Sequence, residues 1–250
     1  MSKRRISKGT KKDQIISTII GLIILCVISY LSNMIYNQEE NTVKTSKAAS
    51  INVVNYNLTN IPEYSGKIYV ELNNNNPYFE EDEYTTEAFE KYSELDENDR
   101  CSVAYANICK EIMPKEGQTR ESISMVKPSG WKQTKINGEY LYNRCHLIAF
   151  QLADESANEK NLITGTRYFN TEGMLPFENE VANYIKKNPK NHVLYRVTPN
   201  FVGDELVARG VEMEAYSVED NGQGVKFNVY VYNVQPGATI DYLTGKATQN

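Results

Sequence analysis

Histidine, tryptophan and cysteine are scarce in this chain, and the scarcity of histidine and cysteine limits the kinds of metal and catalytic site that it can contain. Two histidines and one tryptophan occur in 250 residues, which excludes a site built on three or more imidazoles. The four cysteines include no tight Cys-x₂₋₄-Cys pair, which argues against a structural zinc site. A disulfide that includes Cys145, with Cys101 or Cys109 as its partner, and three free buried thiols both fit the spacing.

Charge is absent from Gln14 to Gln38, directly after a segment that holds six lysines and arginines. An uncharged apolar run of about 20 residues can cross a bilayer as a helix, with its basic side in the cytoplasm. A cleaved signal peptide has a shorter apolar core, and a lipid-modified Cys26 would ordinarily follow a small residue rather than Leu25. We therefore expect a single-pass protein of the cell membrane: a cytoplasmic basic head (1–13), a transmembrane anchor (14–36), a linker (37–62) and an extracellular domain (63–250).

Positive charge is in short supply beyond the anchor. The whole chain carries −5 and its first 35 residues carry +5, so the remainder carries about −10. An acidic domain argues against broad, non-specific adhesion to nucleic acid. Any phosphate binding must therefore depend on a local basic cluster or on a metal ion.

Hydrophobic patterns in the extracellular part predict both strands and helices. A series of strands, then a helix, then a three-stranded meander indicates an α+β fold with a central, mostly antiparallel sheet and flanking helices. Pro176 fits the first turn of the second helix. The expected strands are 66–72, 101–108, 140–150, 192–201, 205–218 and 225–234, and the expected helices are 87–95 and 176–187.

The strand-like stretch "YLYNRCHLIAF", residues 140–150, contains an unusual polar insert. Successive residues of a strand face opposite sides, so Arg144 and His146 share a face that Cys145 does not. A neighbouring cation lowers the pKa of an imidazole, and a neutral imidazole can act as a general base near an anion. A histidine in a strand is more often an ordinary core residue, so this signal is weak by itself.

The following segment adds Asn161, Arg167, Asn170 and Glu178 within 18 residues. Asn170 and Glu178 are eight apart and would lie on roughly one side of a continuous helix. A few hard oxygen ligands supplemented by water are how Mg²⁺ is usually held. Taken separately, these two residues would be an ordinary turn residue and a charge in the first turn of a helix.

Four motifs in order, "NRCH", "NLITGTRYFN", "FENEV" and "YRVTP", resemble the DNA/RNA non-specific endonucleases of the ββα-metal (His-Me finger) class. More narrowly, the motifs look like those of the DNA-entry type nucleases of Gram-positive bacteria. The resemblance covers roughly residues 64–245 and implies a ββα-metal nuclease fold. It implies the following roles: His146 as general base, Arg144 at the phosphate, Asn170 as metal ligand, and Asn161 and Glu178 as residues that order the water around the metal.

Two residues depart from the commoner Asp-Arg-Gly-His motif of that class. Asn143 replaces the aspartate and keeps an acceptor near the metal or the histidine, but without charge. Cys145 replaces the glycine and adds a side chain where glycine allows close approach. The second change is harmless if the thiol points into the core.

Three further residues are candidates for contact with substrate, and two of them also have a structural interpretation. Arg167 falls near the predicted site and is a candidate for substrate binding. Arg196 could line a substrate groove or pair with a carboxylate. Trp131 could stack on a base or fill the core beside a turn.

The function implied is a membrane-anchored, extracellular nuclease that hydrolyses DNA, and RNA as a further candidate, with Mg²⁺ or Mn²⁺ as cofactor. Recognition of the phosphate backbone would give little sequence preference. A catalytically weak or inactive cell-surface nucleic-acid-binding protein of a DNA-uptake system is the main alternative, because Asn143 and Cys145 alter the motif. A secreted toxin nuclease with a cognate inhibitor is the third.

Overall fold

The computed structural model describes residues 58–250, which belong to one compact unit, Val53–Asn250. The expected basic head, the expected anchor and most of the expected linker lie outside the described residues. No helix within residues 58–250 is long and apolar enough to span a bilayer. The domain predicted from residue 63 onward lies wholly within the described part of the chain.

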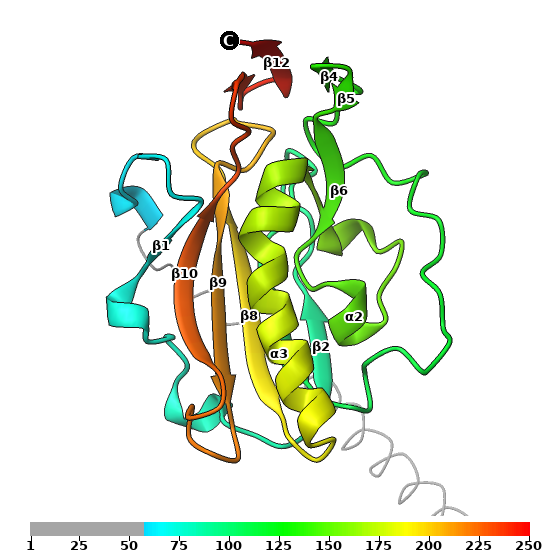
Figure 1. Ribbon diagram of the computed structural model, residues 1–250, viewed down its shortest axis with the longest axis vertical. Coiled ribbons are helices and arrows are strands. Elements are labelled where there is room, and N and C mark those ends of the chain that lie inside the picture. Colours follow the sequence, from blue (N-terminus) through cyan, green and yellow to red (C-terminus); the bar gives the residue numbers. More distant parts are fainter. Residues whose placement is uncertain (1–57) are drawn as a thin grey trace, which may run out of the picture. The chain divides into compact units, whose positions relative to one another are not determined.

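A six-stranded sheet forms the centre of this unit (Figure 1). All its neighbouring strands are antiparallel, as predicted, in the order β1-β10-β9-β8-β3-β2. The strands are β1 (Tyr69–Glu71), β2 (Phe89–Tyr92), β3 (Ala104–Ile108), β8 (Val193–Asn200), β9 (Gly210–Ser217) and β10 (Lys226–Tyr232).

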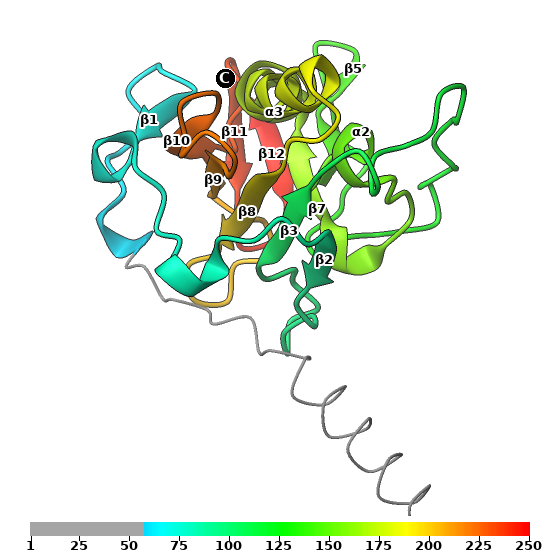
Figure 2. The same ribbon diagram turned by 90° about the horizontal axis from the view of Figure 1, so that it is seen from below.

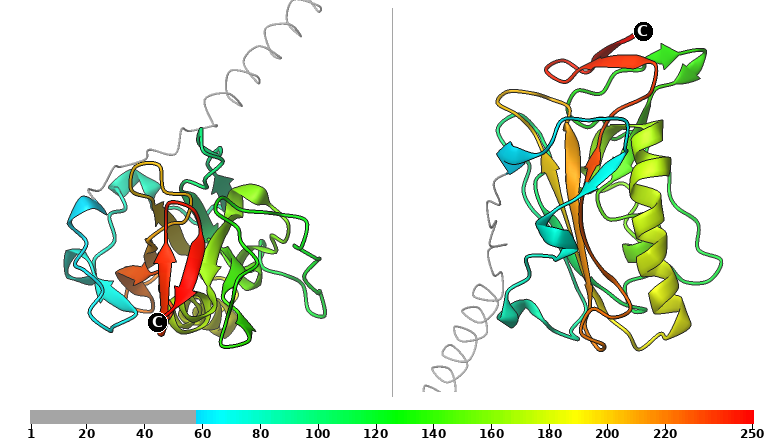
Figure 3. Two further views of the ribbon diagram at one scale, coloured as in Figure 1. Left: turned by 90° about the horizontal axis from the view of Figure 1, so that it is seen from above. Right: turned by 60° about the vertical axis from the view of Figure 1, so that its left-hand side comes forward.

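Side-chain alternation gives the sheet two different buried faces. Helix α3 (Leu175–Lys187) covers one of them, and its Val181, Ala182 and Ile185 join an apolar core with alternate residues of the strands (Figures 1 and 3). The other face holds buried polar residues. Segment 78–83 packs over that face, where the Phe79 ring lies 4.7 Å from the Arg196 guanidinium.

A β-hairpin followed by a helix stands beside the sheet (Figure 1). Strand β6 (Tyr142–His146) pairs with β7 (Leu162–Thr166), and the chain then passes through a π-helical turn, Phe169–Met174, into α3. The short helix α2 (Phe150–Ala153) lies in the β6–β7 connection. Asn233, buried at the end of β10, accepts from the Thr166 amide and donates to the Thr164 and Ala208 carbonyls, which fixes the hairpin against the sheet.

Two small hairpins and several 3-10 turns complete the unit (Figures 2 and 3). The hairpins are β4 (Lys135–Ile136) with β5 (Glu139–Tyr140), and β11 (Ala238–Asp241) with β12 (Lys246–Gln249). The 3-10 turns are Leu58–Asn60, Asn73–Asn75, Glu81–Glu83 and Glu159–Asn161.

Two of the expected elements are wrong. The predicted helix 87–95 is instead the edge strand β2, where Phe89 packs edge-on against Tyr105 of β3 at 4.9 Å, so packing on the sheet overrides the helical spacing. The predicted strand 140–150 is interrupted, because β6 ends at His146 and α2 begins at Phe150. The predicted helix 176–187 and the meander after it are confirmed, with ends shifted by a few residues.

Candidate active site

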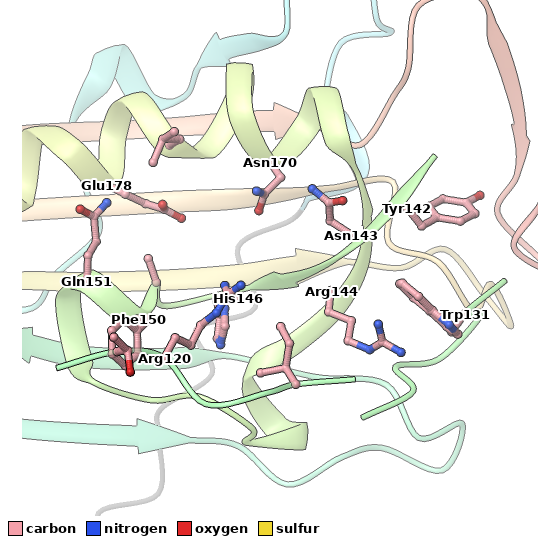
Figure 4. A pocket seen from close by; sticks show the side chains of 14 residues that line it. Arg120, Trp131, Tyr142, Asn143, Arg144, His146, Phe150, Gln151, Asn170 and Glu178 are labelled. Atoms are coloured by element: carbon pink, nitrogen blue, oxygen red, sulfur yellow. The ribbon is translucent and has the colours of Figure 1, made fainter. Parts of the chain in front are cut away.

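A cavity of about 720 Å³ opens between the β6–β7 hairpin, α3 and the long connection between β3 and β4 (Figure 4). Strand β6 contributes Tyr142, Asn143, Arg144 and His146 to it. The π-helical turn and α3 contribute Asn170, Leu175 and Glu178. The remaining lining residues are Thr119, Arg120, Ile123, Trp131, Ala149, Phe150 and Gln151.

His146 sits at the end of β6 with only 6% of its surface exposed. Its Nε2 lies 2.8 Å from the carbonyl oxygen of Ser156. A carbonyl can only accept, so Nε2 carries the proton and the neutral ring has its lone pair at Nδ1. The fold therefore selects the tautomer in which Nδ1 is free to take up a proton.

Burial lowers the pKa of His146, because the charged imidazolium is poorly solvated there. The Ser156 carbonyl opposes this shift, and the positive charge of Arg120 adds to it. The cation expected to depress this pKa was Arg144, and that expectation is wrong: Arg120, from the loop between β3 and β4, has this effect. The ring is neutral near pH 7, as a general base requires.

The guanidinium of Arg144 is engaged on three sides. Its Nε donates to the Val126 carbonyl, and its Nη2 donates to the Ser124 carbonyl at 2.9 Å. Its Cζ lies over the Trp131 ring, 4.0 Å from the ring centre. Trp131 therefore lines the cavity instead of filling the core, with one face of its ring against Arg144.

Asn170 and Glu178 both line the cavity, because the π-helical turn runs without a break into α3. Figure 4 shows the two side chains projecting from this helix toward the same side, with the Asn143 amide facing Asn170 across the cavity. Neither side chain makes a hydrogen bond or ion pair with another residue of 58–250. Burial raises the pKa of Glu178 to about 8, so the carboxyl is protonated at pH 7 in the absence of a cation.

This arrangement fits a hydrated divalent cation. An amide oxygen and a buried, unpaired carboxyl converge on the cavity, and hard oxygens of this kind are preferred by Mg²⁺. Within residues 58–250 no group of three or more histidine, cysteine or acidic side chains could hold a metal. An ion bound here would have few protein ligands and would keep much of its water.

The two departures from the commoner motif fall on opposite sides of β6. Asn143 faces the cavity. Cys145 is fully buried in the apolar core, and its Sγ lies so near Gly165 of β7 that a Cβ there would come within 2.6 Å of it. Cys101, Cys109 and Cys145 are all free and buried, so no disulfide forms among the described cysteines.

Three of the predicted site residues lie elsewhere. Asn161 is fully buried, and its amide is saturated by the backbone of Ile148, with Oδ1 accepting at 2.8 Å and Nδ2 donating at 2.9 Å. Arg167 is exposed and lines a separate cavity of about 380 Å³ beside the β4–β5 hairpin. Arg196 is buried on the far face of the sheet, where it pairs with Glu214 at 2.7 Å.

Arg120 is the residue that sequence reasoning missed. It lies in a loop without hydrophobic periodicity, and a lone arginine in a polar loop is no signal of a site. Together with Arg144 it makes this cavity locally basic in an otherwise acidic domain. A cavity with a neutral imidazole, two cations and oxygen atoms able to bind a metal can hold a phosphodiester and deprotonate a water beside it.

Comparison with known proteins gives a consistent result. Residues 80–219, more than half of the chain, match the model of the family described as DNA/RNA non-specific endonuclease. A deoxyribonuclease of Streptococcus dysgalactiae subsp. equisimilis is 36% identical over 118 residues. That match covers 46% of this chain and 35% of the relative, so the chain corresponds to about a third of that protein's length.

Two solved structures are also similar. NucA from Streptococcus agalactiae, with magnesium bound, shares 30% identity with a TM-score of 0.65, over 76% of this chain and 91% of that one. The Sda1 nuclease, with zinc bound, shares 27% identity with a TM-score of 0.63, over 73% of this chain and 97% of that one. The α+β fold expected from the sequence is therefore the fold of known nucleases.

Proposed function

The chain belongs to the DNA/RNA non-specific endonuclease family, a group of hydrolases acting on nucleic acid, and we propose that it is itself a divalent-metal-dependent nuclease. The proposal rests on one observation: the side chains of His146, Asn170 and Glu178 line the same cavity. Had these side chains lain on opposite faces of the hairpin, they could not have served one scissile bond. An inactive nucleic-acid binder is not favoured, because both replacements in the motif leave this cavity intact.

His146 is the proposed general base. With its Nε2–H held by Ser156, Nδ1 takes a proton from a water molecule, which then attacks the phosphorus. Arg120, the cation that faces His146, binds a non-bridging oxygen of the phosphate and offsets the negative charge that develops there. The low pKa of His146 keeps the base ready at neutral pH.

Asn170 is the proposed ligand of the metal, and Glu178 and Asn143 orient water around it. A divalent cation bound there would neutralise charge on the phosphate and steady the leaving 3′ oxygen. Glu178 would lose its proton as the cation binds, since a neighbouring positive charge favours the carboxylate. We propose Mg²⁺ as the ion, with Mn²⁺ as a substitute, because the donors are few and are all oxygens.

DNA is the proposed substrate and RNA a further one, with contacts to phosphates giving little sequence preference. We also propose that the N-terminal apolar run anchors the enzyme in the cell membrane with its catalytic domain outside. The length and lack of charge of residues 14–38 support this part of the proposal.

Cleavage of supercoiled plasmid by the purified full-length chain, with Mg²⁺, with Mn²⁺ and with a chelator, tests the proposal. We expect nicked and linear products with either metal and none with the chelator. Intact plasmid in every divalent metal tried would remove the enzyme claim. Parallel assays with single-stranded DNA and with RNA define the substrate range.

A further inference from the structure

One wall of the active-site cavity is formed by an irregular loop rather than by a helix or strand. We call residues 118–131 the flap. Thr119, Arg120, Ile123 and Trp131 of the flap all line the cavity. The side chains on this wall, including the proposed phosphate-binding Arg120, therefore depend on contacts made by the loop for their position.

The flap is tied down at both ends. Gln118 donates to the Asp154 carboxylate near one end, and the amide of Glu121 donates to the Ser156 hydroxyl at 3.2 Å. At the other end Thr164 donates to the Ser129 carbonyl at 2.8 Å. Between these ties the hydrogen bonds to the floor of the cavity come from one side chain, that of Arg144.

We propose that Arg144 is a positioning residue that holds the flap closed over the site, rather than a direct ligand of the scissile phosphate. This inference rests on the proposed nuclease function. Two of its nitrogens are used by the Val126 and Ser124 carbonyls, and Trp131 covers one face of its guanidinium. A charged donor to two carbonyls and a cation over an indole ring are both strong contacts for a side chain only partly exposed.

The two arginines of the cavity would then have different roles: Arg144 positions the flap, and Arg120 binds the phosphate. Arg144 holds the middle of the flap, at Ser124 and Val126, and the adjoining part between the ties of Gln118 and Glu121 presents Arg120 to the cavity beside His146. Displacement of a reacting or binding group by about 1 Å can cost on the order of 10²-fold in rate. Loss of Arg144 is therefore expected to act through Arg120.

A double-mutant cycle separates the two possible roles. We expect Arg144→Ala and Arg120→Ala each to reduce kcat/KM, and the double variant to be scarcely slower than Arg120→Ala alone, because Arg144 then has nothing left to position. Multiplication of the two losses would mean that Arg144 contacts the phosphate itself, and would overturn the proposal. Arg144→Lys, which keeps the charge but lacks the planar fork, should resemble Arg144→Ala rather than restore activity.

Arg100 provides a matched control. It also stacks on an aromatic ring, that of Phe201 at 4.9 Å, and donates to two loop carbonyls, Gly203 at 2.7 Å and Glu205 at 3.0 Å. It does not line the active-site cavity. Arg100→Ala should lower the melting temperature without lowering kcat/KM, and an equal loss of activity in this variant would show that general destabilisation explains the Arg144 result.

Fluorescence tests the flap without any cleavage. Trp131 is the only tryptophan of the chain, so emission from the full-length protein reports the flap alone. Arg144→Ala should shift the emission maximum to longer wavelength as the ring gains water, whereas Arg120→Ala should not. An unchanged spectrum in Arg144→Ala would contradict the proposal even in an active enzyme, and a protein with no nuclease activity would contradict the proposed function while leaving this test available.

Discussion

The two faces of the central sheet bury ionisable side chains in different ways. On the far face Arg196 is surrounded by partners: Glu214 at 2.7 Å, Glu83 at 3.5 Å and the Tyr78 carbonyl at 3.0 Å. On the α3 side Glu178 is equally buried, yet no residue of 58–250 pairs with it. A buried charge with its partners in place holds structure together, whereas a buried acid without one, facing a cavity, is available for a ligand.

The largest expected effect is the loss of cleavage activity in His146→Ala, a change in the active-site cavity. Removal of a general base typically lowers the rate by about 10²–10⁴-fold, and the fold should persist because the ring bonds only to the Ser156 carbonyl. Single-turnover cleavage of plasmid measures the rate, and circular dichroism checks the fold. His192→Ala is the control, since that ring pairs with Glu219 outside the cavity; an equal loss in both variants would contradict the assignment.

Arg196→Met tests the far face. It removes the cation beside the buried Glu214, to which the Tyr78 amide still donates, so we expect a loss of about 3–5 kcal/mol in the free energy of unfolding. The folded fraction should keep the wild-type rate of cleavage. Denaturant titration measures the free energy of unfolding, and the plasmid assay measures kcat/KM. A fall in kcat/KM at unchanged stability would instead indicate that Arg196 contacts the substrate.

Glu178→Gln should change how the stability of the protein depends on pH. The pKa of Glu178 is raised from 4.5 to about 8 on folding, so without metal the folded state holds a proton that the unfolded state releases. Stability due to this proton is complete below about pH 4.5 and is lost as the pH rises to about 8. Relative to the glutamine variant, the wild type should therefore lose on the order of a few kcal/mol between pH 5 and pH 9 in chelator.

Thermal unfolding of both proteins across this range provides the measurement. Glu212, on the far face, also has a raised pKa of about 7, but it is common to both proteins and cancels in the difference. Addition of Mg²⁺ at pH 9 should stabilise the wild type more than the variant. Parallel stability curves in chelator would contradict the ionisation described for Glu178.

Cys145→Ala should have the smallest effect. The thiol points into the apolar core, away from the cavity, so we expect a loss of about 1 kcal/mol from the small cavity created and little change in kcat/KM. Chemical denaturation and the plasmid assay measure the two. A tenfold loss of activity would mean that the residue between Arg144 and His146 contributes more to the site than its burial indicates.

The main elements of the fold could be predicted because alternation in the meander and the apolar stripe of α3 are strong local signals. Segment 87–95 could not be, because its pairing with β3, the next strand, decides its conformation, whereas its own apolar spacing fits a helix. The continuity of the helix from Asn170 to Glu178 was open in the sequence, since a π-helical turn precedes Pro176.

The order of the motifs predicted that Asn143, His146, Asn170 and Glu178 belong to one site, and all four line the cavity. The cationic part of the site was not fully predicted. Arg196 is of a residue type that often binds phosphate, but it pairs with carboxylates on the far face of the sheet. Arg120 lies in a loop that reaches the cavity only through tertiary contacts. Asn161 is buried outside the cavity lining, where its amide binds the Ile148 backbone.

Chemical rescue by imidazole tests most directly whether His146 supplies the base for a phosphodiester held beside Asn170. The experiment compares plasmid cleavage by His146→Ala and by Asn170→Ala in Mg²⁺, with increasing imidazole at constant pH and ionic strength. We expect imidazole to restore cleavage to His146→Ala in proportion to its neutral form, and to leave Asn170→Ala unimproved. No rescue of His146→Ala, or equal rescue of both variants, would contradict the account.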